Sequence, residues 1–170
     1  MWQAIVETVR DEFSDVPDVA ELTRLTVRLL MALVLGAMIG YERERRGSAA
    51  GLRTHMLVSL GTAVFVLVPL QAGMKIEDLS RVIQGVISGI GFLGAGAVLK
   101  LDRSQQIRGL TTAAGIWATS AIGMTAGMGL EATAVFVTVL SIVVLDVLLR
   151  VEKALIRRGW SDAPRQPPER

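Results

Sequence analysis

Residues 82–99 read VIQGVISGIGFLGAGAVL, a run of 18 residues without Asp, Glu, Lys or Arg. As an α-helix this segment would extend about 27 Å, close to the roughly 30 Å of hydrocarbon in a bilayer. Two further uncharged runs, of 19 and 22 residues, cover 56–74 and 109–130. These runs indicate an integral membrane protein, because a water-facing surface would intersperse charges among the apolar residues.

The composition of the whole chain agrees with this assignment. Of its 170 residues 51% are hydrophobic and 17 are glycine, and the mean hydropathy is +0.49. Two weaker apolar runs are each interrupted by a single charge, Arg28 or Asp146. We therefore predict an all-α, polytopic membrane protein whose transmembrane domain covers residues 25–151. The five predicted transmembrane helices are 25–41, 56–73, 82–99, 110–130 and 132–149.

The two ends of the chain lie outside these spans. In residues 1–24, apolar side chains from Trp2 to Phe13 recur at helical spacing, with charged residues opposite. This pattern predicts a short amphipathic helix in the membrane interface. Residues 152–170 are basic and rich in proline, and we expect a partly disordered cytoplasmic tail.

The distribution of Lys and Arg predicts the orientation. The side of the predicted spans that holds the N-terminus carries 4 basic residues, and the opposite side carries 13. Because basic residues near spans are retained in the cytoplasm, we expect the N-terminus outside and the C-terminus in the cytoplasm.

Glycine at four-residue spacing lets membrane helices approach closely. We expect the spans 25–41, 82–99 and 110–130 to pack tightly through such stripes. A stripe can hold one subunit together, or it can form the face of a homodimer. The glycines in question are Gly36, Gly40, Gly85, Gly89, Gly115, Gly123 and Gly127.

Two predicted spans begin with similar sequences, GLRT at 51–54 and GLTT at 109–112, each after an arginine-bearing loop. Threonine hydroxyls there are candidate N-caps, and the positive helix ends could hold a phosphate or a lipid head group. Alternatively, Arg53 or Arg108 pairs with the glutamates that follow the first span, or the arginines only mark the cytoplasmic side. The predicted cluster consists of Glu42, Glu44, Arg53, Thr54, Arg108, Thr111 and Thr112.

Ion pairs are expected where opposite charges stand four residues apart, as with Asp146 and Arg150. Glu42 can likewise pair with Arg45, three residues on, or with Arg46, four residues on. We place Arg46 in the more exposed part of its loop, and expect Arg53 to be more important for function.

Two polar side chains fall inside the predicted spans at similar depth, Arg28 and Gln84. Polar groups in a bilayer usually face protein or water. We expect a structural hydrogen bond between them, with a role in binding or conducting a ligand as the alternative.

The residue inventory argues against several classes of function. The chain has no cysteine and one histidine, and no catalytic set stands at a plausible depth, so we expect neither an enzyme nor a cofactor or metal site. The net charge of +2 does not indicate nucleic-acid binding.

Four ordered motifs resemble the MgtC/SapB family of bacterial inner-membrane proteins. They are GYERERRG at 40–47, AGLRTH at 50–55, IGFLGAG at 90–96 and RGLTTAA at 108–114. The resemblance covers about residues 22–155 and includes Arg28 and Gln84. It implies a bacterial inner-membrane protein connected with magnesium limitation and, in pathogens, with survival inside host cells.

Members of this family are often described as magnesium transport proteins, but the resemblance more credibly implies regulation of other membrane proteins. Our leading hypothesis is a non-enzymatic regulator that contacts partner helices through glycine-lined faces and forms a homodimer in the lipid bilayer. Other inner-membrane proteins are further candidate partners. The alternative is a small transporter or channel for Mg²⁺ or another ion, with a polar path that includes Arg28 and Gln84.

Overall fold

The structure is a computed structural model that describes residues 1–12, 18–98, 109–148, 150–151 and 154. Within these residues all regular secondary structure is helical, which confirms the prediction of an all-α protein for this part of the chain. The helices are α1 (Trp2–Glu12), α2 (Val19–Arg45), α3 (Leu52–Gln71), α4 (Leu79–Val98), α5 (Leu110–Gly127), α6 (Glu131–Val143) and the π-helix η1 (Val144–Leu148).

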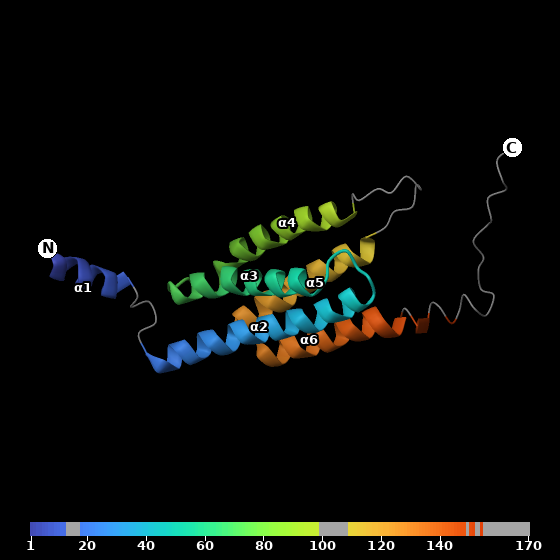
Figure 1. The fold of residues 1–170 in the computed structure, drawn as a ribbon, viewed down its shortest axis with the longest axis horizontal. Coiled ribbons are helices and arrows are strands. Elements are labelled where there is room, and N and C mark those ends of the chain that lie inside the picture. The colour runs from blue at the N-terminus through green and yellow to red at the C-terminus, as the bar shows by residue number, and fades with distance from the viewer. Residues whose placement is uncertain (13–17, 99–108, 149, 152–153, 155–170) are drawn as a thin grey trace.

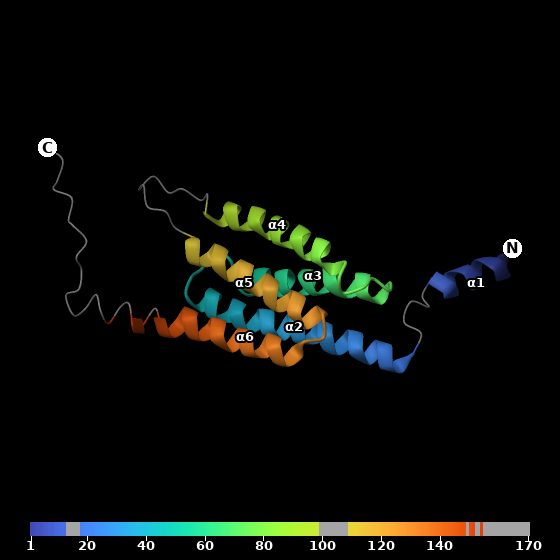
Figure 2. The same ribbon diagram turned by 180° about the vertical axis from the view of Figure 1, so that it is seen from behind.

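Helices α2 to α6 lie side by side in one elongated bundle, and α1 stands apart from it (Figures 1 and 2). In both views α4 lies along one edge of the bundle and α6 along the opposite edge. None of the residues of α1 is buried, so this helix contributes nothing to the core of the bundle.

Helix α5 is the centre of the bundle. It contacts each of α2, α3, α4 and α6, and ten of its residues are buried, more than in any other described helix. Many of these residues are Gly, Thr or Ser, which are small enough for neighbouring backbones to approach closely. The central position therefore follows from the size of its side chains rather than from their hydrophobicity.

Three helices in the described part of the chain are long and apolar enough to cross a membrane: α2, α3 and α4. Helix α5 has 18 residues but is rich in Thr, Ser and Gly, and α6 has only 13 residues before the π-helix begins. Five membrane crossings therefore stay a prediction. The neighbours that surround α5 reduce its need for apolar side chains, because a helix shielded by protein does not face lipid.

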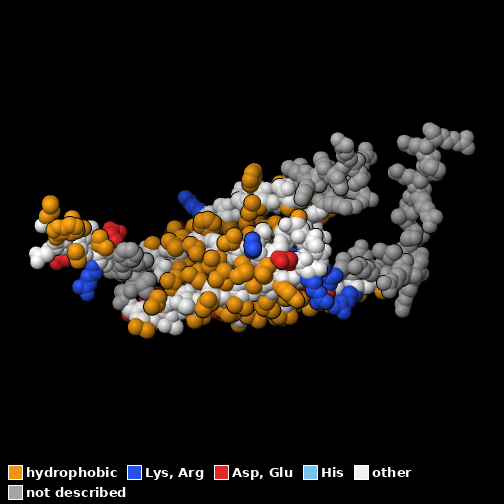
Figure 3. All heavy atoms as spheres, in the orientation of Figure 1, with side chains coloured by type: hydrophobic (Ala, Val, Ile, Leu, Met, Phe, Trp, Pro, Cys, Tyr) orange, Lys and Arg blue, Asp and Glu red, His pale blue; other side chains and the backbone are white. Residues whose placement is uncertain are grey.

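Apolar and charged side chains are separated on the surface. Figure 3 shows apolar side chains over the middle of the bundle, and a group of Lys and Arg side chains toward the end at which η1 lies. We call this end the arginine end. It contains the end of α2, the start of α3 and the π-helix η1.

Candidate functional site

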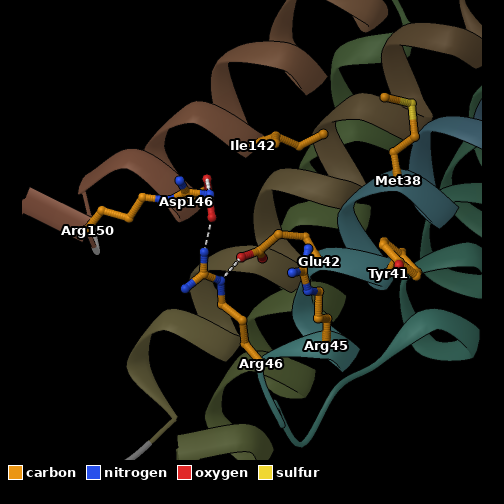
Figure 4. A pocket seen from close by; sticks show the side chains of 8 residues that line it. All are labelled: Met38, Tyr41, Glu42, Arg45, Arg46, Ile142, Asp146 and Arg150. Carbon is orange, nitrogen blue, oxygen red and sulfur yellow. Dashed lines mark hydrogen bonds and ion pairs between the residues drawn. The ribbon is translucent and has the colours of Figure 1, made fainter.

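A chain of ion pairs joins α2 to η1 at the arginine end. Glu42 accepts from Arg43 Nε at 2.7 Å through one carboxylate oxygen and from Arg46 through the other. Arg46 also contacts Asp146, whose second oxygen accepts from Arg150 Nη2 at 2.7 Å (Figure 4). Five charged side chains are thus connected in one row, and their order is Arg43, Glu42, Arg46, Asp146 and Arg150.

Two of these pairs confirm expectations from the sequence. The contacts between Glu42 and Arg46 and between Asp146 and Arg150 both follow four-residue spacing. The placement of Arg46 in an exposed part of the loop was wrong, because its side chain is only 25% exposed and bridges two helices. The bridge to Asp146 spans 100 residues of sequence, so helical periodicity gives no signal for it.

The predicted threonine caps are not formed. Helices α3 and α5 have Gly51 and Gly109 as N-cap residues, neither with a side-chain cap. The backbone N–H of Leu52 instead donates to the Glu44 carboxylate at 2.8 Å. The sequence located both helix starts, but α3 receives its capping acceptor from the end of α2.

The threonines themselves lie in different surroundings. Thr54 and Thr111 are exposed, whereas Thr112 is buried and its hydroxyl lies 3.0 Å from that of Ser48. This contact ties the loop after α2 to the first turn of α5.

The expected pairing of Arg53 with Glu42 or Glu44 was also wrong. Glu42 is taken by two arginines and Glu44 by the start of α3, while Arg53 is exposed and forms no ion pair within the described residues. Arg108 lies outside the described residues.

A row of buried polar groups continues from the arginine end into the bundle, between α3 and α5. His55 is fully buried, and its Nδ1 lies 2.8 Å from the Thr119 hydroxyl. One helical turn further, Ser59 is also fully buried, and the Thr62 hydroxyl donates to Ser120 O at 3.1 Å. His55 Nε2 and Ser59 Oγ have no hydrogen-bond partner in the described part of the chain.

Glycines in α2 and α5 provide the close contacts around this row. A Cβ on Gly36 would lie 2.8 Å from His55 O, and one on Gly40 would lie 2.7 Å from Leu52 Cα. A Cβ on Gly123 would overlap Ser59 O, and one on Gly127 would lie 2.5 Å from Ala63 O. Gly115 faces the His55 ring more loosely, because a Cβ there would lie 3.4 Å from Cε1.

Within one subunit, the glycine stripe of residues 82–99 is not tightly packed at Gly85 and Gly89, and the homodimer face stays a prediction. A Cβ on Gly85 or Gly89 would meet none of the described residues within 4 Å. Only Leu79 and Ile90 are buried on α4, because this helix lies at the edge of the bundle. The sequence showed a glycine face on each of three helices, but it held no information on whether a neighbour covers that face.

The expected hydrogen bond between Arg28 and Gln84 is not formed. Arg28 Nη1 donates to Gly127 O at 3.5 Å, and its guanidinium lies beneath Gly129. A cation there complements the negative end of α5. Gln84 is exposed on α4, so the two side chains are held by different parts of the bundle.

The described residues contain no group of three or more His, Asp or Glu side chains that could hold a metal ion. Several contacts that sequence reasoning missed join distant segments, among them Arg46 with Asp146, His55 with Thr119 and Ser48 with Thr112. The one signal available was that His55, the single histidine, stands inside the AGLRTH motif.

Comparison with known proteins gives relatives over most of the chain. It is 43% identical to protein SrpB of Synechococcus elongatus, covering 80% of this chain and 81% of SrpB. It is 38% identical to the putative magnesium transporter YhiD of Escherichia coli, covering 79% of this chain and 65% of YhiD.

The chain is also 40% identical to protein MgtC of Salmonella typhimurium, covering 73% of this chain and 52% of MgtC, so the match spans about half the length of that relative. No solved structure matches the chain significantly. The model of the MgtC family matches residues 29–154, which include α3 to α6, most of α2 and the whole row of ion pairs. The chain belongs to the MgtC family.

Proposed function

We propose that this protein is a non-enzymatic inner-membrane protein of magnesium homeostasis that acts on other membrane proteins through helix–helix contacts. The name of one relative, the putative magnesium transporter YhiD, supports the connection with magnesium. One structural observation carries the mode of action. The glycines of α2 and α5 are covered by neighbouring helices, whereas Gly85 and Gly89 of α4 are open.

The open face of α4 combines small and polar residues with exposed apolar side chains such as Phe92. Gln84 and Ser88 are exposed on it beside the two glycines. Polar side chains at membrane depth normally face protein, where small residues allow close approach and amides or hydroxyls form hydrogen bonds. This combination supports α4 as the helix that contacts a partner.

The first occupant that we propose for the α4 face is a second copy of the chain. Around a two-fold axis the same face meets itself, so Gln84 would meet an amide that both donates and accepts. Cysteine cross-linking tests this proposal cleanly, because the chain has no cysteine. Ser88→Cys should give an oxidised dimer in native membranes, whereas Phe65→Cys, on the exposed face of α3, should stay monomeric. Equal cross-linking of both variants would contradict the assignment.

A matched pair of glycine substitutions tests the function. Gly61 of α3 and Gly89 of α4 both have open space where a side chain would begin. At equal protein levels Gly89→Leu should impair growth in low magnesium, and Gly61→Leu should not. Normal growth of the Gly89 variant would exclude the α4 face from the function.

The alternative function is a small transporter for Mg²⁺ or another ion, as the name of YhiD suggests for that relative. Purified protein in liposomes distinguishes the two proposals. The regulator proposal expects no protein-dependent Mg²⁺ flux. Protein-dependent Mg²⁺ flux that disappears in Arg28→Ala would contradict the regulator proposal and support the transporter proposal.

We also propose that all five helices α2 to α6 cross the inner membrane, with the arginine end in the cytoplasm. Their side-by-side arrangement supports five crossings (Figure 2), and the excess of basic residues at one end supports the orientation.

A further inference from the structure

A groove of about 650 Å³ lies at the arginine end between α2 and the segment formed by α6 and η1. We call it the α2–η1 groove. Figure 4 shows charged side chains from both walls converging on it. Its lining consists of Met38, Tyr41, Glu42, Arg45, Arg46, Ile142, Asp146 and Arg150.

The groove has an apolar part and a cationic part. Met38 and Ile142 lie further along the helices toward the middle of the bundle, and Arg45 and Arg150 lie toward its end. Met38 and Arg45 are separated by seven residues of α2, which is about 10 Å along a helix axis. This gradient from apolar to cationic over about 10 Å is the polarity profile of a bilayer edge.

The charges of the lining do not balance. Each carboxylate oxygen of Glu42 and Asp146 already accepts from an arginine. Arg45 has no ion-pair partner in the described part of the chain, and Arg150 is 75% exposed beyond its one contact. The groove therefore has cationic donors left over for an additional anion.

The backbone around Asp146 is also unusual. Helix α6 changes at Val144 from α-helix to the π-helix η1, and Asp146 stands within that segment. Short π-segments within α-helices often occur at functional sites. Here the π-helical residue contacts Arg46, the C-cap residue of α2, so this segment fixes one wall of the groove against the other.

We propose that the α2–η1 groove binds an anionic phospholipid. Its phosphate contacts Arg45 and Arg150, the Tyr41 hydroxyl lies at head-group level, and an acyl chain follows Met38 and Ile142. Guanidinium groups bind phosphate oxygens with charge-assisted hydrogen bonds, and clustered basic residues at a membrane edge favour anionic lipids. A free phosphate would use the same arginines but would gain nothing from the apolar part of the groove.

Lipid binding to the purified full chain in detergent tests the proposal, with native mass spectrometry counting bound phosphatidylglycerol and phosphatidylcholine. We expect phosphatidylglycerol to bind more tightly. Arg45→Gln should raise its apparent Kd about fivefold, the effect of one basic residue near a membrane surface. Arg53→Gln is the matched control, because Arg53 is exposed at the same end, forms no ion pair among the described residues and does not line the groove.

Three results would overturn the proposal. Equal weakening by both arginine variants would mean binding to surface charge, and no weakening by Arg45→Gln would remove the groove from lipid binding. Displacement of phosphatidylglycerol by inorganic phosphate at a similar concentration would make a soluble phosphate the ligand. Met38→Ser supplies an independent check: it should weaken long-chain phosphatidylglycerol more than the dihexanoyl form, and an equal effect on both would exclude the acyl-chain assignment.

Discussion

The fully buried His55 ring forms a hydrogen bond with the Thr119 hydroxyl, which lies 2.8 Å from its Nδ1. Thr119→Val keeps the shape of the residue but removes the hydroxyl that is hydrogen-bonded to the buried Nδ1. We expect this substitution to lower the free energy of unfolding by about 1–3 kcal/mol, the usual cost of a stranded buried polar atom. Thermal unfolding in detergent micelles measures the effect.

Ser59→Ala is the natural control for that substitution. The Ser59 hydroxyl is buried without a partner in the described residues, so its removal should leave the unfolding temperature unchanged or raise it slightly. If Ser59→Ala destabilises as much as Thr119→Val, the hydroxyl is hydrogen-bonded in the membrane.

The glycines make a second prediction at the level of single residues. A methyl group on Gly123 would overlap Ser59 O, whereas one on Gly89 would contact none of the residues that the structure describes. Gly123→Ala should therefore destabilise the monomer by about 1–3 kcal/mol, the usual cost of overpacking. Gly89→Ala should leave the monomer as stable as the wild type in dilute detergent. Similar unfolding temperatures for the two variants would contradict the packing of α5 on α3.

At the scale of whole helices, the sequence predicts well that each helix of the bundle exists and roughly where in the chain it lies. Uncharged runs indicate the apolar helices, and the two similar Gly-Leu sequences stand where α3 and α5 begin. Both are local signals, because helical spacing and breaks in charge can be read within one segment. Four-residue spacing likewise predicts the pairs of Glu42 with Arg46 and of Asp146 with Arg150.

Contacts between helices could not be read in this way. A glycine stripe identifies one face of a helix but not the neighbour that covers it, so Gly89 and Gly123 look equivalent in sequence and differ in the bundle. The bridge from Arg46 to Asp146 and the bond between His55 and Thr119 depend on how distant helices are arranged. The expected contact of Arg28 with Gln84 fails for the same reason. The depth of a residue in the membrane is predictable from the sequence, but the neighbouring helix that its side chain faces is not.

The start of α3 offers a prediction for one element. Glu44 accepts the Leu52 N–H at 2.8 Å and so satisfies one of the free donors of the helix. Glu44→Ala should cost about 0.5–2 kcal/mol, as for other lost N-terminal caps. Glu44→Gln keeps an acceptor oxygen and should recover most of that loss. Equal destabilisation by both variants would assign the effect to the charge rather than to the cap.

At the scale of the whole molecule, the row of ion pairs ties α2 to the last described turns of the chain. Arg46 is its central member, with contacts to Glu42 and Asp146, and all three side chains are less than a third exposed. Arg46→Ala should lower stability by about 1–2 kcal/mol, between the values for exposed and fully buried pairs. Arg53→Ala should have little effect, which reverses the order expected from the sequence.

Growth in low magnesium at equal protein levels, together with unfolding in detergent, checks this reversal. In both measurements Arg46→Ala should have a larger effect than Arg53→Ala. A stronger growth defect in Arg53→Ala than in Arg46→Ala, with unchanged stability, would mean that the start of α3 is more important for function than the row of ion pairs.

The orientation of the molecule in the membrane is the last property to predict. Lys75 and Arg81 are the basic residues near the turn between α3 and α4, whereas the arginine end collects basic residues from three segments. From this asymmetry we predict that the turn lies outside the cell membrane and the arginine end lies in the cytoplasm. Asp78→Cys and Arg53→Cys put single thiols on exposed positions at the two ends, in a chain that has no cysteine of its own. An impermeant maleimide should label position 78 in intact cells and position 53 only after permeabilisation. The opposite labelling pattern would mean that the bundle has the opposite orientation in the membrane, with the α2–η1 groove at the outer leaflet.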